Sequence, residues 1–269
     1  MEIKQKTKHI NAEYEPIKLL IESFILLILA GSVLLYLPIS YKIGQLPFIN
    51  CLFTATSAVC VTGLTVVDTS LFTFFGQVVI VCLIQLGALG IMMFATLFII
   101  AVSHKISIRD KLMFKDVAHE LTIHSIWILL KRILFFTLII ELIGASVLFF
   151  TVFLKLHNLK DAIFYSIFHS VSAFCNAGFS LYPDNLVRFK GDIFCNVTIM
   201  SLIVFGGIGF IVLNDLYENI KNKFFKKGKG YFKLKLHTKI VLATTGILIF
   251  SGALFFFILE YGNILKNYA

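Results

Sequence analysis

Two thirteen-residue segments of the chain have the composition of backbone turns that could bind a cation. Phe53–Thr65 reads FTATSAVCVTGLT, and Phe168–Ser180 reads FHSVSAFCNAGFS. The segments lie 115 residues apart and share a phenylalanine, a serine, an alanine, a cysteine and a glycine at equivalent positions. Glycine allows a turn with positive φ, and carbonyl oxygens on such a turn can replace the hydration shell of an ion. The repeated pattern therefore suggests a repeated hairpin whose turn brings main-chain carbonyl oxygens into a pore.

Each segment includes the end of an apolar run of helix length and lies between two long apolar spans. The first run, Phe48–Ala58, would extend only about 17 Å as a helix, roughly half of a hydrocarbon core about 30 Å thick. Non-helical backbone that returns from this depth is tolerated only inside protein or beside a water-filled path. One copy alone would suit an external loop with a short surface helix. The second run, Asp161–Phe174, favours a repeated re-entrant hairpin instead.

The composition is that of an all-α integral membrane protein. Hydrophobic residues make up 58% of the chain and charged residues only 14%, whereas soluble domains are about 25% charged. The net charge of +9 does not indicate nucleic-acid binding, because the basic residues lie between apolar spans rather than on one soluble face. The five cysteines have no metal-ligand spacing and are expected to be small buried hydrophobes. No metal site beyond a transported ion and no cofactor are expected in this chain.

The elements needed to position the two segments are five long apolar spans and two short pore helices. The spans are expected at 19–37, 77–102, 126–154, 193–216 and 240–259. The organisation that follows is a cytoplasmic arm (1–18), a first span–pore loop–span repeat (19–102), a cytoplasmic linker (103–125), a second repeat (126–216), a basic cytoplasmic loop (217–239) and the first span of an incomplete third repeat (240–269). Glycines at Gly87–Gly90 and Gly206–Gly209 are expected to let another helix approach closely.

The basic residues fix the predicted orientation. In this topology 18 of the 24 Lys and Arg side chains lie on one side of the membrane, which the positive-inside rule assigns to the cytoplasm. The chain is therefore expected to be a multi-pass protein of the cell (inner) membrane, with the lipid bilayer as partner and a cytoplasmic N-terminus.

Three acidic residues are candidates for a role in ion passage. Asp68 and Asp184 follow the two glycine turns, where they would either raise the local cation concentration at an outer mouth or simply form turns. Glu141 falls near the middle of the third span, where an ionisable group is costly. It would either serve a coupled carrier or bond the backbone donors or hydroxyl groups of a neighbouring helix. No set of nucleophile, base and orienting group can be assembled, so an enzyme is not expected.

Several motifs together resemble the membrane subunit of the Trk/Ktr/HKT potassium-transporter superfamily, closest to its bacterial KtrB type. They are the paired loops SAVCVTGL and SAFCNAGF, the run LIQLGALGIM after the first loop, FGGIGF after the second, and LHTKIVL at the start of the last span. The similarity extends from about residue 19 to residue 261.

The resemblance implies a pseudo-fourfold pore built from four repeats, each of which gives one filter strand. Val61, Thr62 and Gly63 would line the filter from the first repeat, and Asn176, Ala177 and Gly178 from the second. Family members with serine at the first glycine tend toward sodium, so Gly63 indicates potassium, with sodium coupling left open. The resemblance also implies potassium uptake by a membrane homodimer that works with a cytoplasmic nucleotide-binding regulatory subunit of the KtrA/TrkA type.

The chain departs from this family pattern in its extent. It supplies two filter strands and the first span of a third repeat, whereas four repeats at this period would need roughly 460 residues. We expect a fragment, with a pore completed by two chains as the alternative. A half-size ion-coupled carrier that uses Glu141 and a non-transporting membrane scaffold also remain open at this point.

Overall fold

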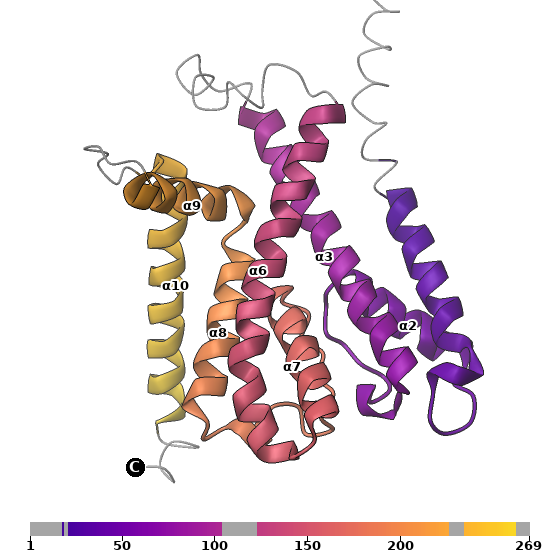
Figure 1. Ribbon diagram of the computed structural model, residues 1–269. Coiled ribbons are helices and arrows are strands. Elements are labelled where there is room, and N and C mark those ends of the chain that lie inside the picture. The colour runs from indigo at the N-terminus through magenta and orange to yellow at the C-terminus, as the bar shows by residue number, and fades with distance from the viewer. Residues whose placement is uncertain (1–17, 19–20, 104–122, 226–233, 262–269) are drawn as a thin grey trace, which may run out of the picture. The chain divides into compact units, whose positions relative to one another are not determined.

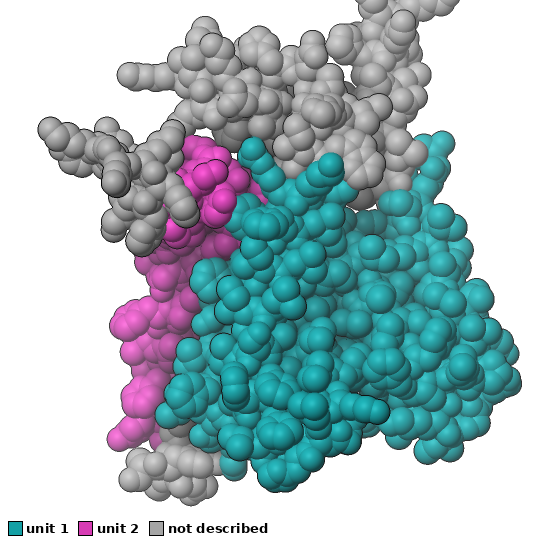
Figure 2. Space-filling view, in the orientation of Figure 1, with its two compact units in different colours: residues 1–207 teal, residues 208–269 magenta. Residues whose placement is uncertain are grey.

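A computed structural model describes residues 18, 21–103, 123–225 and 234–261. Most of the predicted cytoplasmic arm and linker, and the middle of the basic loop, lie outside these ranges. The chain divides into two compact units, residues 1–207 and residues 208–269, which Figure 2 colours separately. Each unit is considered by itself.

The described residues of the first unit form mainly helices (Figure 1). Its helices are an N-terminal helix at Ile21–Tyr36, α2 (Phe48–Val59), α3 (Phe74–Ser103), α6 (Ile123–Leu156), α7 (Leu159–Phe174) and α8 (Ile193–Gly207), with short 3-10 turns at Pro38–Ser40, Thr69–Leu71 and Val187–Phe189. The only β-pairing among the described residues is one isolated bridge. The all-α membrane fold is therefore confirmed.

The predicted pore helices are present at the expected places. α2 packs against α3, and α7 packs against α6 and α8. The N-terminus of α7 is capped by Asn158, whose side chain accepts hydrogen bonds from the amides of Lys160 and Asp161. Asp161 lies in the first turn, where a carboxylate interacts favourably with the helix dipole.

The long helices are apolar enough to cross a membrane. Phe74–Met93, Leu130–Leu156 and Leu236–Glu260 each qualify by length and hydropathy, while Ile21–Tyr36 is shorter. Large apolar side chains remain exposed along these helices, for example Leu26 at 70% and Phe150 at 68%. Such a surface suits contact with lipid rather than with water.

The predicted fourth span, 193–216, is not one continuous helix. α8 ends at Gly207, and α9 (Phe210–Phe225) begins after a break in which Gly209 has a φ of +85°. Right-handed helix cannot continue through that conformation, which glycine adopts at little cost. The two helices together qualify as one membrane span only if that span is broken at this point.

The second unit contains α9 and α10 (Leu236–Glu260). Its two helices are tied together by Asp215, a residue 2% exposed whose carboxylate accepts a 3.0 Å hydrogen bond from the amide of Lys235. Lys235 precedes α10, so this contact fixes where that helix begins relative to α9.

Candidate ion-coordinating loops

The first glycine turn leaves α2 through a Schellman motif. The amide of Val61 donates to the carbonyl of Ala58 at 3.3 Å, and the amide of Thr62 donates to the carbonyl of Ser57 at 3.0 Å. These are the two bonds that define the motif. The position that requires positive φ holds Val61, with φ of 57°, and two residues later Gly63 has φ of 70°.

The second turn repeats this geometry at the end of α7. The amide of Asn176 donates to Ala173 at 3.0 Å, and the amide of Ala177 donates to Ser172 at 2.7 Å. Asn176 has φ of 59° and Gly178 has φ of 71°. The gapless alignment of the two segments therefore corresponds to one backbone conformation, built twice.

Val61 is the strained member of the pair. Asparagine tolerates the left-handed region, whereas a β-branched residue there is a real outlier, and the cost is about 1–2 kcal/mol. The surrounding hydrogen bonds must hold it in place. One of them joins the hydroxyl of Thr62 to that of Ser57, at 3.0 Å.

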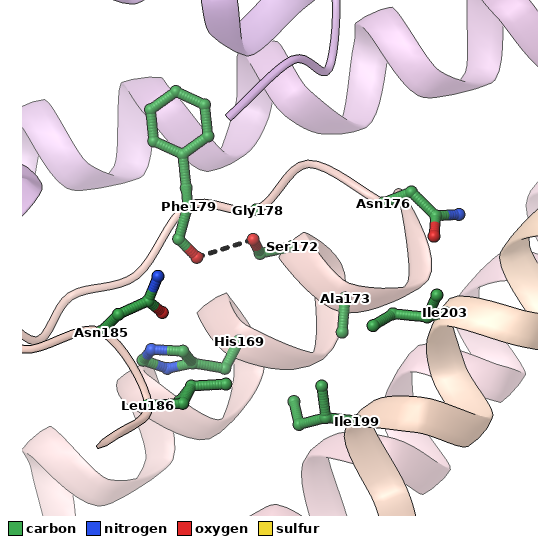
Figure 3. A pocket seen from close by; sticks show the side chains of 10 residues that line it. All are labelled: His169, Ser172, Ala173, Asn176, Gly178, Phe179, Asn185, Leu186, Ile199 and Ile203. Carbon is green, nitrogen blue, oxygen red and sulfur yellow. Dashed lines mark hydrogen bonds between the residues drawn. The ribbon is translucent and has the colours of Figure 1, made fainter. Parts of the chain in front are cut away.

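The second loop is held by an equivalent serine in a different way. The hydroxyl of Ser172 donates to the carbonyl oxygen of Phe179 at 2.7 Å, the contact drawn as a dashed line in Figure 3. This bond closes the loop across Asn176–Gly178. The serine shared by the two segments thus bonds its own loop in both repeats.

The two loops meet at their glycines. A Cβ atom placed on Gly63 would lie 2.4 Å from the carbonyl oxygen of Ala177 and 3.1 Å from the Cα atom of Gly178. A Cβ atom on Gly178 would lie 3.5 Å from the Cα atom of Gly63. Two stretches of backbone that lie 115 residues apart are therefore in contact, with no room for a side chain on Gly63.

Two further glycines allow the spans to approach the ends of the pore helices. A Cβ atom on Gly87 of α3 would lie 2.0 Å from the carbonyl oxygen of Val59, and one on Gly206 of α8 would lie 1.7 Å from that of Phe174. The close approach expected from the two glycine patches is confirmed at these positions. The other patch glycines behave differently. Gly90 faces the ring of Phe24, and Gly207 and Gly209 have no neighbour within 4 Å among the described residues.

A cavity of about 260 Å³ opens next to the two glycines. Its lining residues are Gly63, Thr65, Val66, Val67, Asp68, Thr69, Gly178, Ser180, Tyr182, Pro183 and Asn185. Asp68 contributes to this lining and also caps the turn Thr69–Leu71, because its carboxylate accepts a 2.8 Å hydrogen bond from the amide of Ser70. The turn-forming alternative for Asp68 therefore applies without removing its charge from the cavity.

Asp184 has a different environment. Its carboxylate accepts three hydrogen bonds from Arg188, the shortest at 2.6 Å, and this guanidinium lowers the pKa of Asp184. The guanidinium also lies 4.2 Å from the ring centroid of Tyr182. The two acids that the sequence suggested as equivalent therefore differ in net local charge, since the positive charge of Arg188 compensates the negative charge of Asp184. The spacing of four residues between Asp184 and Arg188 was the sequence signal for this ion pair.

His169 is a structural residue that the sequence reasoning missed. One ring nitrogen lies 2.7 Å from the carbonyl of Tyr165, and the other lies 3.0 Å from the hydroxyl of Ser180 and 3.4 Å from the amide of Leu181. The ring also borders a cavity of about 230 Å³ beside the second loop, closed on another side by Ile199 and Ile203 of α8 (Figure 3). The equivalent residue of the first segment is a threonine, so the repeat gave no signal for it.

The cysteines divide into two groups. Cys51, Cys175 and Cys195 are buried, as predicted, but Cys60 and Cys82 are exposed in this chain. The prediction of five buried cysteines was wrong for these two, because an apolar neighbourhood in the sequence does not show whether a side chain faces the interior of the protein or its surface.

Glu141 lies directly behind the second loop and is only 5% exposed. Its main-chain carbonyl accepts a 2.7 Å hydrogen bond from the hydroxyl of Ser170 on α7. Its carboxyl group bonds the side chain of Gln85 and lies 3.9 Å from the sulfur of Cys175. The sequence located a buried acid here but not these partners.

Comparison with known proteins assigns the family. The model of a family described as TrkH, cation transport protein, matches residues 4–267. This chain belongs to the TrkH family. It is 42% identical over 261 residues to the Ktr system potassium uptake protein B of Bacillus subtilis, which covers 96% of this chain and 56% of the relative.

Two other relatives give the same picture. The TrkH-family chain is 37% identical to the potassium/sodium uptake protein NtpJ of Enterococcus hirae, over 94% of this chain and 54% of the relative. It is 35% identical to the Ktr system potassium uptake protein B of Vibrio alginolyticus, over 91% of this chain and 52% of the relative. The chain thus spans about half the length of the curated relatives it matches.

Proposed function

We propose that this TrkH-family chain supplies part of the ion pathway of a Ktr/Trk-type potassium uptake system, in which main-chain carbonyl oxygens of the two loops coordinate K⁺. The observation that carries the proposal is the contact between Gly63 and the backbone of Ala177 and Gly178. Two identical turns that meet backbone to backbone bring carbonyl groups from both repeats to one place.

The alternation of backbone handedness supports this role. Along Val61, Thr62 and Gly63 the sign of φ is positive, negative and positive, and the second loop shows the same alternation. In an extended strand successive peptide groups point to opposite sides, whereas alternation of handedness turns their carbonyls toward the same side. A row of oxygens on one side of the backbone is what a dehydrated cation needs.

The close contact at Gly63 also supports discrimination between ions. A side chain at this position would face both a positive φ and an atom 2.4 Å away, so it would displace one loop from the other. Coordination distances would then change, and K⁺ and Na⁺ would be affected differently because their sizes differ. We therefore assign potassium as the preferred ion, with sodium coupling as a further possibility to be measured.

The partners follow from the same assignment. We propose a homodimer in the cell (inner) membrane with a cytoplasmic N-terminus, regulated by a cytoplasmic nucleotide-binding subunit of the KtrA/TrkA type. The names of two relatives refer to a Ktr system, which supports the existence of further components. The basic segment around 217–239 would face such a subunit.

The proposal is tested by expressing two proteins in a bacterium that lacks potassium uptake. One is the 269-residue chain, and the other is a chimaera in which this chain is followed by the remaining part of the Bacillus subtilis relative. Two loops leave roughly half of the ion coordination unfilled, and an unsatisfied carbonyl in hydrocarbon costs several kcal/mol. We expect growth on low-potassium medium with the chimaera and not with the short chain.

The variant Gly63→Ser in the chimaera should lose selectivity over sodium. Gly44→Ser is the matched control, because Gly44 also has positive φ, +69°, but has no neighbour within 4 Å among the described residues. Unchanged selectivity in Gly63→Ser would refute the filter role. Failure of both proteins to support growth would favour a membrane scaffold, and growth with the short chain alone would favour a pore completed by two chains.

A further inference from the structure

Behind the second loop, three buried or half-buried polar side chains from different parts of the sequence come together. Gln85 lies on α3 of the first repeat, Glu141 lies on α6 of the second repeat, and Cys175 follows the last residue of α7. Cys175 directly precedes Asn176, the first residue assigned to the second filter strand. The group formed by Gln85, Glu141 and Cys175, called here the acid–thiol cluster, therefore joins the two repeats at the start of that strand.

The geometry places Cys175 between two oxygen acceptors. Its sulfur is 3.8 Å from the side-chain oxygen of Gln85 and 3.9 Å from a carboxyl oxygen of Glu141. The carboxyl group also bonds the side chain of Gln85. A thiol has one proton to donate, so it donates to one of these two acceptors at a time.

The main chain of Glu141 also bonds a side chain of α7. The hydroxyl of Ser170, which lies five residues before Cys175, donates to the carbonyl oxygen of Glu141 at 2.7 Å. One residue of α6 thus contacts α7 at two points, on either side of the last helical turn. Two contacts fix the rotation of that turn as well as its position.

The burial of Glu141 makes these bonds consequential. The ion pairs among the described residues are Lys18–Glu22 and Asp184–Arg188, so the Glu141 carboxyl group is held by hydrogen bonds rather than by a cation. A lone charge at membrane depth costs several kcal/mol, whereas a protonated carboxyl group can both donate and accept. The acid–thiol cluster suits a carboxyl group that keeps its proton and holds Gln85 and Cys175 in place through hydrogen bonds.

The first repeat lacks the burial that this link provides. Cys60, which is equivalent to Cys175 in the aligned segments, is exposed, whereas Cys175 is 7% exposed. The two turns share one backbone conformation but differ in what lies behind them. The second strand is thus tied to the first repeat by side chains that have no counterpart at Cys60 among the described residues.

We propose that Glu141 is a positioning residue for the second filter strand. It fixes Cys175, and through it Asn176–Gly178, against the first loop, and this placement sets the discrimination between K⁺ and Na⁺. The inference rests on the proposed ion pathway. A positioning role differs from a carrier role for Glu141, because a residue that only holds its neighbours in place need not exchange its proton during transport.

The first test measures the placement of Cys175 without transport. Purified 269-residue chain in detergent is prepared with Cys175 as its only cysteine, and the rate of maleimide labelling is followed. The background substitutions are Cys51→Ala, Cys60→Ala, Cys82→Ala and Cys195→Ala. We expect Glu141→Ala to raise the rate about threefold to tenfold, the factor given by loss of a hydrogen bond of ordinary strength. Glu141→Gln, which keeps a donor and an acceptor, should change it less.

A matched control uses another buried polar residue of the same helix. Thr151 is 8% exposed and bonds the carbonyl of Leu148 at 2.9 Å, and it lies ten residues, about 15 Å, farther along the helix. Thr151→Val should leave the labelling rate of Cys175 unchanged. An unchanged rate in Glu141→Ala, or an equal rise in Thr151→Val, would overturn the positioning role.

The second test measures selectivity in the chimaera. Glu141→Ala should lower the ratio of K⁺ to Na⁺ uptake by about tenfold, Glu141→Gln should retain most of it, and Thr151→Val should retain it fully. Loss of uptake in Glu141→Gln, with labelling of Cys175 at the wild-type rate, would overturn the positioning role and favour a carrier in which Glu141 exchanges its proton. Wild-type selectivity in Glu141→Ala would overturn the link from placement to discrimination.

Two features of the design separate failure of the positioning role from failure of the proposed function and from misfolding. If the unsubstituted chimaera does not transport, the proposed function fails, while the labelling experiment still decides the positioning role. If Glu141→Ala does not give folded protein, the double variant Glu141→Leu with Gln85→Leu takes its place, because replacing both amide and carboxyl partners by apolar groups leaves only the weak thiol donor of Cys175 without an acceptor. This variant should fold and still label faster at Cys175, and an unchanged rate would refute the inference.

Discussion

The close approach of α8 to the end of α7 can be tested by adding one methyl group. In Gly206→Ala the new Cβ atom would lie 1.7 Å from the carbonyl oxygen of Phe174 and 3.0 Å from the side-chain nitrogen of Asn176. The adjacent change Gly207→Ala meets nothing within 4 Å among the described residues. The two variants add the same atom to the same helix, so their difference isolates the contact.

The size of the effect follows from the overlap. Ordinary contact begins at 3.4 Å, so α8 and the end of α7 must separate by more than 1 Å, and insertion of a methyl group into a packed core costs about 1–3 kcal/mol. Alanine itself favours a helix over glycine by up to about 1 kcal/mol. Gly206→Ala should therefore be the less stable variant by about 1–3 kcal/mol, which corresponds to roughly 3–10 °C in Tm for a protein of this size.

The measurement is thermal unfolding of the purified chain in one detergent, with both variants and the unsubstituted chain in parallel. Gly207→Ala should unfold at or slightly above the midpoint of the unsubstituted chain. The contact between Gly87 and Val59 predicts a similar loss in Gly87→Ala, since its Cβ atom would lie 2.0 Å from a carbonyl oxygen. Equal midpoints for Gly206→Ala and Gly207→Ala would refute the packing described for the pore helices.

Two further predictions concern the outer mouth and the topology. In the chimaera, Asp68→Asn should raise the apparent KM for potassium at low ionic strength more than Asp184→Asn does, because Arg188 already compensates the charge of Asp184; equal effects, or a KM unchanged in both variants, would leave these acids only their local structural roles. A reporter fused after Lys229 should be cytoplasmic and one fused after Tyr182 external, and finding both on one side would remove the repeated topology.

The elements were predictable from the sequence because the length and hydropathy of a span depend on local composition. The pore helices and the turn at Gly63 could be located for a second reason: a motif that occurs twice in the sequence reveals two copies of one structure. The break after Gly207 was not foreseen. The run of glycines suggested close packing, and the positive φ of Gly209 also ends a helix, which hydropathy does not reveal.

The side chains that support the loops were less predictable. Gln85 and Cys175 are 90 residues apart, and the sulfur of Cys175 reaches Glu141 on a third helix. Such contacts depend on how helices pack, which periodicity in one helix does not determine. The pairing of Asp184 with Arg188 is local and could have been considered, but symmetry between the repeats favoured treating the two acids alike.

The ends of the two pore helices have an electrostatic consequence of their own. Both α2 and α7 end at the loops, and neither has a basic residue in its last turn. Aligned peptide dipoles leave the equivalent of about half a negative charge at a helix C-terminus. Two such ends directed at neighbouring stretches of backbone make the region of Gly63 and Gly178 attractive to cations and unfavourable to anions. This contribution acts close to the last helical turn and depends on helix orientation, so it would persist through small shifts of the loops that alter individual carbonyl distances.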